Sequence, residues 1–206
     1  MSILLHPTYF PNIAHMAAMA QSNCVLFEKE DNFSKQTFRT RTYIYAANGE
    51  LLLNIPVVYS QKNRQKYKDI LVSHDTKWQG IHWKSLLSAY KTSPFFEYYE
   101  DELQPLFELP VKYLLDFNLK CFDVICDCLQ FYPEIDFTTE YQHELQGITD
   151  LRHLVERKSN SQFQNEPYTQ VFDTKHGFKP NLSILDLLFN EGPNALHYLE
   201  QQNVKF

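Results

Sequence analysis

Two histidines, a tyrosine and an asparagine lie in one short stretch that directly follows the first apolar run of the chain. The four residues are His6, Tyr9, Asn12 and His15. Imidazole groups suit acid-base chemistry near neutral pH, and phenol and amide groups can hold a polar ligand. The competing interpretation is a structural turn with packed aromatic side chains, because the stretch matches no known catalytic spacing. The residue types therefore locate a candidate site without naming its reaction.

The elements around this stretch are expected to place it at the edge of a sheet. Residues 3–5 form a short apolar run typical of a buried strand, residues 13–21 have helical spacing, and residues 24–28 again suit a strand. A helix that joins two strands in this way makes a right-handed crossover between parallel strands. Ligands of such sheets bind outside the carboxyl ends of the strands. The side chains expected at that edge are His6, Tyr9, Asn12, Glu28 and Asp31.

A β-hairpin is predicted at about residues 37–58, where Asn48-Gly49 separates two strand-like runs. Because side chains alternate along a strand, Arg39, Arg41 and Tyr43 are expected on one face, with the two arginines about 7 Å apart. Two guanidinium groups at that spacing could grip a phosphate or a carboxylate. The alternative is an exposed strand face with solvated arginines.

Helical spacing dominates the middle and the end of the chain. One helix is predicted from Trp78 towards Pro94, and His82 lies one turn beyond Trp78. A histidine on such an apolar stripe is more often a hydrogen-bonded core residue than a ligand. The other predicted elements are helices at 94–107, 111–129, 149–154, 182–189 and 194–202, and strands at 134–138 and 168–172.

Strands interleaved with helices predict an α/β fold. We expect a three-layer domain with a central, largely parallel sheet, one β-hairpin (about 37–58) and a helix-rich middle and C-terminus. A chain of 206 residues can bury one sizeable core, so residues 1–206 are expected to form a single domain.

Composition excludes several classes of protein. The net charge of −6 and the lack of a basic stripe argue against nucleic acid as the main partner. No apolar run is long enough to span a bilayer and the N-terminus does not resemble a signal peptide, so we expect a cytoplasmic protein. Cys121, Cys126 and Cys128 fall within one predicted helix, which favours reduced thiols over disulfides or zinc. We therefore expect no metal site and no cofactor.

Known catalytic motifs are mostly missing. The sequence has no G-x-S-x-G elbow, no P-loop and no G-x-G-x-x-G, and it has only five glycines. Asn12-Ile13-Ala14-His15 is a weak echo of the H-x-G-H signature of nucleotidylyltransferases, with the first histidine and the glycine absent. A divergent nucleotidylyltransferase-like enzyme is therefore one alternative.

Several segments, in their order along the chain, resemble one known family. They are His6-Pro7-Thr8-Tyr9-Phe10-Pro11, Arg39-Thr40-Arg41, Leu53-Asn54-Ile55-Pro56-Val57, Trp78 to Phe96, Leu114-Leu115-Asp116-Phe117-Asn118, and Leu182 to Gly192. Together they are similar to the WbqC-like protein family over nearly the whole chain. Many members of that family carry Gln-Pro where this chain has His6-Pro7, and Gly-Tyr where it has Ala14-His15.

The resemblance implies a cytoplasmic transferase of bacterial surface-polysaccharide (O-antigen type) biosynthesis. Such an enzyme would transfer an aminoacyl group such as glycine, or an acyl group, to a sugar or a sugar nucleotide. His6 and His15 would then be catalytic, with a neutral imidazole taking the proton from an attacking sugar amine. Substrate-binding roles would fall to Tyr9, Asn12, Arg39, Arg41, Trp78, His82, Trp83 and Tyr90.

A non-enzymatic binding or scaffold protein of polysaccharide assembly is the rival hypothesis from another class. It would use a tyrosine-rich surface and the segment Pro94-Phe95-Phe96-Glu97-Tyr98-Tyr99 to bind a protein partner. The two hypotheses differ in where these side chains point. A closed pocket that contains His6 and Arg39 favours an enzyme, whereas an exposed aromatic face favours a partner protein.

Overall fold

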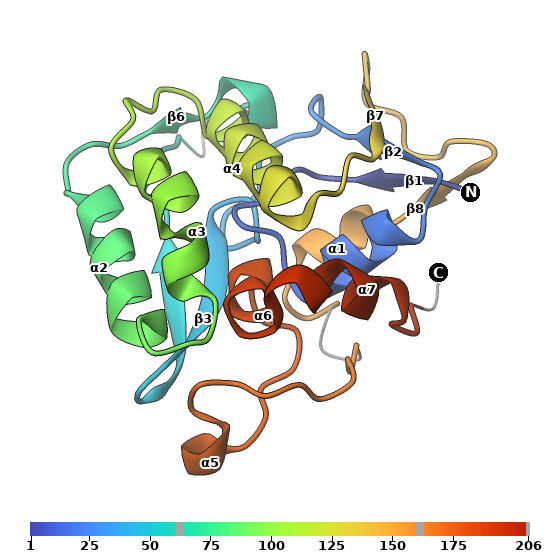
Figure 1. Ribbon diagram of the computed structural model, residues 1–206. Helices are drawn as coiled ribbons and strands as arrows, with labels where there is room; N and C mark the ends of the chain where they lie inside the picture. Colours follow the sequence, from blue (N-terminus) through green and yellow to red (C-terminus); the bar gives the residue numbers. More distant parts are fainter. Residues whose placement is uncertain (61–63, 160–162, 205–206) are drawn as a thin grey trace.

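The protein is an α/β molecule built around a parallel sheet (Figure 1). The computed structural model describes residues 1–60, 64–159 and 163–204. Four strands form the central sheet in the order β7-β2-β1-β8, and every neighbouring pair is parallel. The strands are β1 (Ser2–Leu5), β2 (Cys24–Phe27), β7 (Glu134–Phe137) and β8 (Ile148–Asp150). This confirms the predicted fold class and the parallel pairing of the first two strands.

The first crossover forms for local reasons that the sequence shows. Helix α1 (Ile13–Ala20) begins where the Asn12 side chain accepts a hydrogen bond from the backbone N–H of His15, which satisfies one of the unpaired donors of the first turn. In β1, Ile3, Leu4 and Leu5 are all fully buried, so both faces of the strand are covered. A strand buried on both faces is typical of a parallel sheet and explains why this run shows no alternation.

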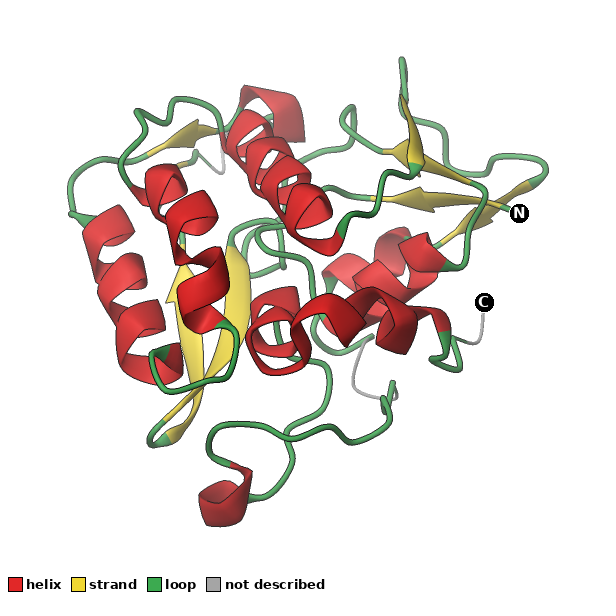
Figure 2. Cartoon of the chain, viewed as in Figure 1, coloured by secondary structure: helices red, strands yellow, loops and turns green. Residues whose placement is uncertain are grey.

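The hairpin forms a small antiparallel sheet of its own, apart from the central one (Figure 2). Strands β3 (Arg41–Ala46) and β4 (Gly49–Asn54) are joined by Ala47 and Asn48, and Gly49 has a φ of 105°, which glycine adopts without steric cost. The predicted hairpin is confirmed, but its first strand begins four residues later than predicted. Arg39 therefore lies in the turn before β3.

Helices pack around both sheets, and α1 contacts the C-terminal pair α6 and α7. Short strands β5 (Val57–Val58) and β6 (Leu71–Val72) pair with each other. The α-helices after α1 are α2 (Trp78–Tyr90), α3 (Phe96–Leu103), α4 (Leu114–Leu129), α5 (Asp173–His176), α6 (Ile184–Glu191) and α7 (Ala195–Glu200). The 3₁₀ turns are η1 (Tyr67–Asp69), η2 (Gln104–Phe107), η3 (Arg152–Val155) and η4 (Gly192–Asn194).

Two predicted elements are wrong. Residues 168–172 form no strand, because Tyr168 and Gln170 turn their side chains into a buried polar cluster around Asp186 of α6 instead of pairing with a neighbouring strand. Residues 148–150 form the edge strand β8 and not the start of a helix, and only the short turn η3 follows. A three-residue strand offers no alternation that could separate it from a helix start.

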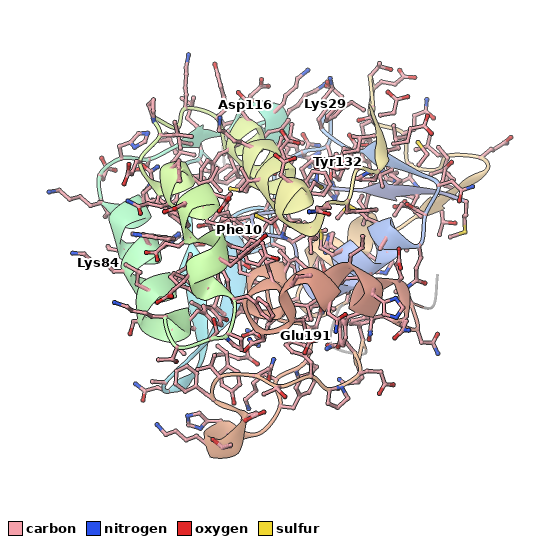
Figure 3. All side chains as sticks on the ribbon, in the orientation of Figure 1. Phe10, Lys29, Lys84, Asp116, Tyr132 and Glu191 are labelled. Carbon is pink, nitrogen blue, oxygen red and sulfur yellow. The ribbon has the colours of Figure 1, made fainter. Side chains whose placement is uncertain are left out.

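The core holds most of the aromatic side chains. Phe10 lies in the middle of the molecule (Figure 3) and is fully buried. Phe27 of β2 meets Phe122 of α4 edge to face. In the part of the chain that the structure describes, no helix is both long and apolar enough to cross a membrane.

Candidate functional site

A cavity of about 390 Å³ opens at the carboxyl ends of the central strands. Its walls come from the segments that leave β1, β2 and β8, together with the turn that precedes β3. Because parallel strands bring their carboxyl ends to one edge, residues far apart in the sequence meet here. The charged and imidazole-bearing side chains that line it are His6, Asp31, Arg39, His143, Asp150, Arg152, His153 and Glu156.

His6 and Asp31 form a hydrogen-bonded pair in this cavity. Asp31 Oδ2 lies 2.9 Å from His6 Nε2 and 3.7 Å from an NH2 group of Arg39. Burial raises the pKa of Asp31, but the His6 hydrogen bond and the Arg39 charge outweigh it and lower the pKa below the usual range. Asp31 is therefore ionised, and His6 donates Nε2–H to it.

The tautomer of His6 leaves its second ring nitrogen basic. Burial lowers the pKa of His6 to about 4, and the hydrogen bond to Asp31 only partly opposes this effect. The ring is thus neutral at pH 7, with its proton on Nε2 and a lone pair on Nδ1. Nδ1 is buried and makes no hydrogen bond to any residue that the structure describes. A neutral imidazole oriented by a carboxylate is the arrangement that general bases use.

Arg39 is a buried charge held by the loop after β2 and by two aromatic rings. It is 3% exposed, donates to the Asn32 carbonyl at 3.0 Å, and lies over the rings of Tyr67 and Phe33. Its Nε makes no hydrogen bond within the described residues. A guanidinium group in this position supplies a fixed positive charge beside the imidazole.

Glu28 fixes the loop that carries Asp31. The carboxylate is fully buried, and its Oε1 accepts the backbone N–H groups of Glu30 and Asp31 and the hydroxyl of Thr138, which follows β7. Its other oxygen lies 3.6 Å from Arg152. One carboxylate therefore links the ends of β2, β7 and β8 and sets the position of Asp31.

Arg152 closes the cavity from the β8 side. Its guanidinium pairs with Asp150 at 2.6 Å, donates to the carbonyls of Gln142 and His143, and lies over the Tyr141 ring. These contacts hold the long segment between β7 and β8 against the strand ends.

The backbone of the loop after β1 is pinned along its length. Tyr67 donates its hydroxyl hydrogen to the Pro7 carbonyl, the Tyr9 N–H donates to Phe38, and the hydroxyls of Thr42 and Ser183 donate to the Phe10 carbonyl. Phe10 also holds a φ of 40°, an unfavourable conformation for a phenylalanine. Strain of this kind persists only where surrounding contacts enforce it, so the loop presents His6 in a preorganised position.

His15 and Asn12 lie behind the cavity wall and do not line it. His15 is 1% exposed, its Nδ1 is 3.1 Å from Asn12 Oδ1, and burial lowers its pKa to about 3. Asn12 is also buried and acts as the helix cap. The arrangement gives both residues a place in the first turn of α1, in line with an orienting or packing role.

Both histidines should make the protein less stable in acid. Their folded pKa values, about 4 and about 3, lie below the ordinary histidine pKa of 6.5, so the unfolded chain binds more protons between these values. The free energy of unfolding should therefore decrease as the pH falls below 6.5, by up to about 1.4 kcal/mol per pH unit for each histidine. His15→Ala should be less stable than the wild type at pH 7, and the gap should narrow towards pH 4.5 in urea titrations. A constant gap would contradict the neutral buried state of His15.

Three of the residues expected to bind substrate, Tyr9, Trp78 and His82, do not line the cavity that contains His6. Tyr9 is fully buried and its hydroxyl bonds His82 Nδ1 at 2.9 Å, while Trp78 packs edge-on against that imidazole. These residues fill the space between the first loop and α2, because their large apolar surfaces are more stable in the core. The prediction that they would shape one pocket with His6 is corrected for Tyr9, Trp78 and His82.

Trp83 and Tyr90 also lie away from the cavity. Trp83 stacks on Phe96 and packs against Phe107, and the Tyr90 hydroxyl donates to Asp186 at 2.7 Å. Both side chains join α2 to other helices. Tyr90 is a core residue and Trp83 is partly buried against the core, so the prediction that they would line one pocket with His6 is corrected too.

Arg39 and Arg41, which were expected to share one strand face, line two different cavities. Arg41 in β3 lines a neighbouring cavity with Tyr43, and Arg39 lines the His6 cavity from the turn before the strand. The period-two alternation holds over residues 41–44, where Thr42 and Ile44 are buried and Arg41 and Tyr43 are half-buried, and it ends at Tyr45, which is also buried. It fails at Arg39 because the strand has not begun there.

Sequence reasoning missed the contribution of residues 141–156. Tyr141, His143, Asp150, Arg152, His153 and Glu156 all line the cavity. The sequence did contain one signal for them, because Asp150 and Arg152 directly follow the short β-branched run Ile148-Thr149. If that run is a strand parallel to β1, its carboxyl end lies beside His6. Within the described residues, no group of three or more His, Cys, Asp or Glu side chains could hold a metal ion.

Comparison with known proteins adds a family and one distant relative. The model of the WbqC-like protein family matches residues 6–160 and 157–198. "Uncharacterized protein Rv1507c" of Mycobacterium tuberculosis (strain ATCC 25618 / H37Rv) is 23% identical over 222 residues, which cover 95% of this chain and 96% of that protein. No solved structure matches the chain.

Proposed function

The chain belongs to the WbqC-like protein family, and from that premise we propose that it is a transferase of bacterial surface-polysaccharide biosynthesis. The proposed reaction moves an acyl or aminoacyl group, such as glycine, to the amine of a sugar or sugar nucleotide in the cytoplasm. The observation that carries the proposal is the His6–Asp31 pair in a cavity at the carboxyl ends of the parallel strands.

The pair supplies the base that amide formation needs. The amine nitrogen attacks the carbonyl carbon of an activated donor, a thioester or an acyl phosphate, and a new C–N bond forms. His6 Nδ1, which is shielded from solvent in the unliganded protein, is uncovered by substrate binding in this proposal and takes the proton that the nitrogen loses. The bond from carbon to the leaving group then breaks, its electron pair departs with the sulfur or oxygen, and His6 returns the proton to that group.

Asp31 and Arg39 would support this step electrostatically. Asp31 holds the ring in the Nε2–H tautomer and stabilises the imidazolium that forms, at the 2.9 Å distance observed. Arg39 supplies a positive charge beside the pair, where negative charge develops on the carbonyl oxygen.

The positions of the aromatic side chains support an enzyme over a scaffold protein. His6 and Arg39 share one cavity, whereas the segment at residues 94–99 points mostly inward: Phe96 and Tyr99 are buried, and Tyr98 is the exposed aromatic of the segment. His15 is fully enclosed in α1, so the echo of a nucleotidylyltransferase signature gains no support.

The test is product formation from defined mixtures. Purified protein is incubated with UDP-linked and dTDP-linked amino sugars and with glycyl, acetyl or formyl donors in thioester or acyl-phosphate form, and the amide product is sought by mass spectrometry. We expect one pair to give a product whose mass is the sum of amine and acyl donor less the leaving group. Failure of all pairs, with intact protein, would contradict the proposed transfer.

A further inference from the structure

Three cavities adjoin one another in a series that begins at His6. The His6 cavity and a neighbouring cavity of about 600 Å³ share Ser34 and Glu156 in their walls. That second cavity and a third of about 190 Å³ share Tyr43 and Arg157. Shared wall residues place the three cavities side by side, in an order that the successive parts of one extended ligand could follow.

The middle cavity concentrates positive charge in an acidic protein. Lys35, Arg41, Arg157 and Lys158 line it, against one carboxylate, Glu156, although the chain as a whole carries a net charge of −6. Hydroxyl and amide groups of the loop at residues 34–37 complete the wall. Several cations and neutral donors around one hollow match a ligand with more than one phosphate group.

Arg41 is the cation best suited to contact such a ligand. Its side chain is half-buried and makes one long hydrogen bond, 3.4 Å from Nε to Asn54 Oδ1, so its other N–H groups are not committed by that bond. Arg157 is more constrained, because it pairs with Glu50 at 2.6 Å and lies 3.9 Å over the Tyr43 ring. Gln36, in the loop opposite, holds a φ of 64°, a strained conformation for glutamine.

The third cavity suits a flat ring. Phe38, Tyr43 and Phe163 contribute aromatic surface, and Gln164 and Asn181 contribute amide groups. Its volume of about 190 Å³ and its aromatic walls suit a flat heterocyclic base better than a long lipid chain.

We propose that the three cavities together bind a nucleoside diphosphate ester. The base occupies the Phe38–Phe163 end, the diphosphate lies against Arg41 and its neighbouring cations, and the group linked to the diphosphate reaches the His6 cavity. Glu156 lines both the middle cavity and the His6 cavity. At that border its carboxylate can accept hydrogen bonds from the hydroxyls of a sugar linked to the diphosphate. The role of the His6 cavity in this inference rests on the proposed function. Binding of the nucleoside diphosphate in the other two cavities does not depend on that function.

Calorimetric titration tests the assignment without any turnover. The probes are UDP, ADP, GDP, CDP and dTDP, with the matching monophosphates and nucleosides, pyrophosphate, and farnesyl diphosphate. We expect one diphosphate to bind, its monophosphate to bind roughly tenfold more weakly, and its nucleoside to bind more weakly still. Arg41→Gln should raise the Kd of the diphosphate about tenfold or more. Lys84→Gln, on the exposed face of α2 at the edge of the molecule in Figure 3, is the matched control and should leave the Kd unchanged.

The outcomes separate this inference from the proposed reaction. Absence of binding by every nucleoside diphosphate, or a Kd that Arg41→Gln leaves unchanged, would overturn the phosphate assignment whether or not transfer occurs. Pyrophosphate or farnesyl diphosphate binding as tightly as the best nucleotide would overturn the base position. His6→Gln should retain the Kd for the nucleoside diphosphate, so a transfer reaction that fails while this binding persists would contradict the reaction alone.

Discussion

Replacing His6 with glutamine should lower the turnover number of the proposed transfer reaction by about 100-fold or more. Glutamine can still donate its side-chain N–H to Asp31, as His6 Nε2 does at 2.9 Å, but it has no nitrogen that can take a proton. The expected loss is the usual contribution of a positioned general base, roughly 10² to 10⁴ in rate. The measurement is turnover of the donor and acceptor pair found by mass spectrometry, with the melting temperature of each variant as a control for folding.

The pH dependence of this effect identifies the group responsible. His6 is a base only when neutral, and its pKa is lowered to about 4, so the rate ratio of wild type to His6→Gln should be constant above about pH 5.5. The ratio should fall towards one as the pH drops through about 4, and titration of the substrate amine cancels because it affects both proteins equally. Full activity in His6→Gln would exclude acid-base catalysis by His6 and would mean that another group takes the proton.

Asp31→Asn is a separate test of orientation. Asparagine keeps the size of the side chain and one acceptor oxygen but removes the charge that stabilises an imidazolium. We expect a lower turnover number with little change in substrate Kd, and a smaller loss than for His6→Gln. A loss confined to the Kd would mean that Asp31 binds substrate and does not position His6.

Much of the fold follows from local patterns in the sequence. The apolar runs at residues 3–5 and 24–28 with a helix between them predict the parallel pair β1 and β2, and Asn48-Gly49 predicts the hairpin. Both depend on short-range chemistry: buried apolar side chains in one case and a turn conformation in the other. β8 could not be predicted, because a three-residue edge strand is defined by its partner, β1, and not by its own pattern.

Less of the candidate site could be predicted from the sequence, because part of it depends on the pairing of strands that are far apart in the chain. His6 and the neighbouring Asp31 could be placed at the strand ends from connectivity alone, and the structure pairs them. Asp150 and Arg152 reach the cavity because β8 pairs with β1. Since β8 was not predicted, these two residues were not predicted at the site either. Tyr9 and His82 were wrongly predicted to bind substrate, because their residue types suit a ligand site. In the structure both are buried, and the Tyr9 hydroxyl and the His82 imidazole form a hydrogen bond with each other in the core.

Replacing Asp186 with alanine should destabilise the protein by about 3 to 5 kcal/mol, the range for breaking a buried charged network. The carboxylate is fully buried in α6 and accepts the hydroxyls of Tyr90 and Tyr168 and the amide of Gln170 at 2.6 to 2.9 Å. Burial raises its pKa, and the three hydrogen bonds oppose that effect without cancelling it. Its removal leaves the buried hydroxyls of Tyr90 and Tyr168 without their acceptor, and each such group costs about 1 to 3 kcal/mol, whereas the Gln170 amide keeps the Lys179 carbonyl as an acceptor.

The control for this prediction is Asp127→Ala, on the exposed side of α4, which should change stability by less than about 0.5 kcal/mol. Tyr90→Phe and Tyr168→Phe should each cost less than Asp186→Ala, because each removes a single donor and leaves the carboxylate two others. Urea unfolding measured by circular dichroism gives the free energies. Because Tyr90 also accepts the Tyr45 N–H of β3, the cluster joins the hairpin to α2 and α6. Equal stability of wild type and Asp186→Ala would mean that the segment at residues 168–172 is held by packing and not by this carboxylate.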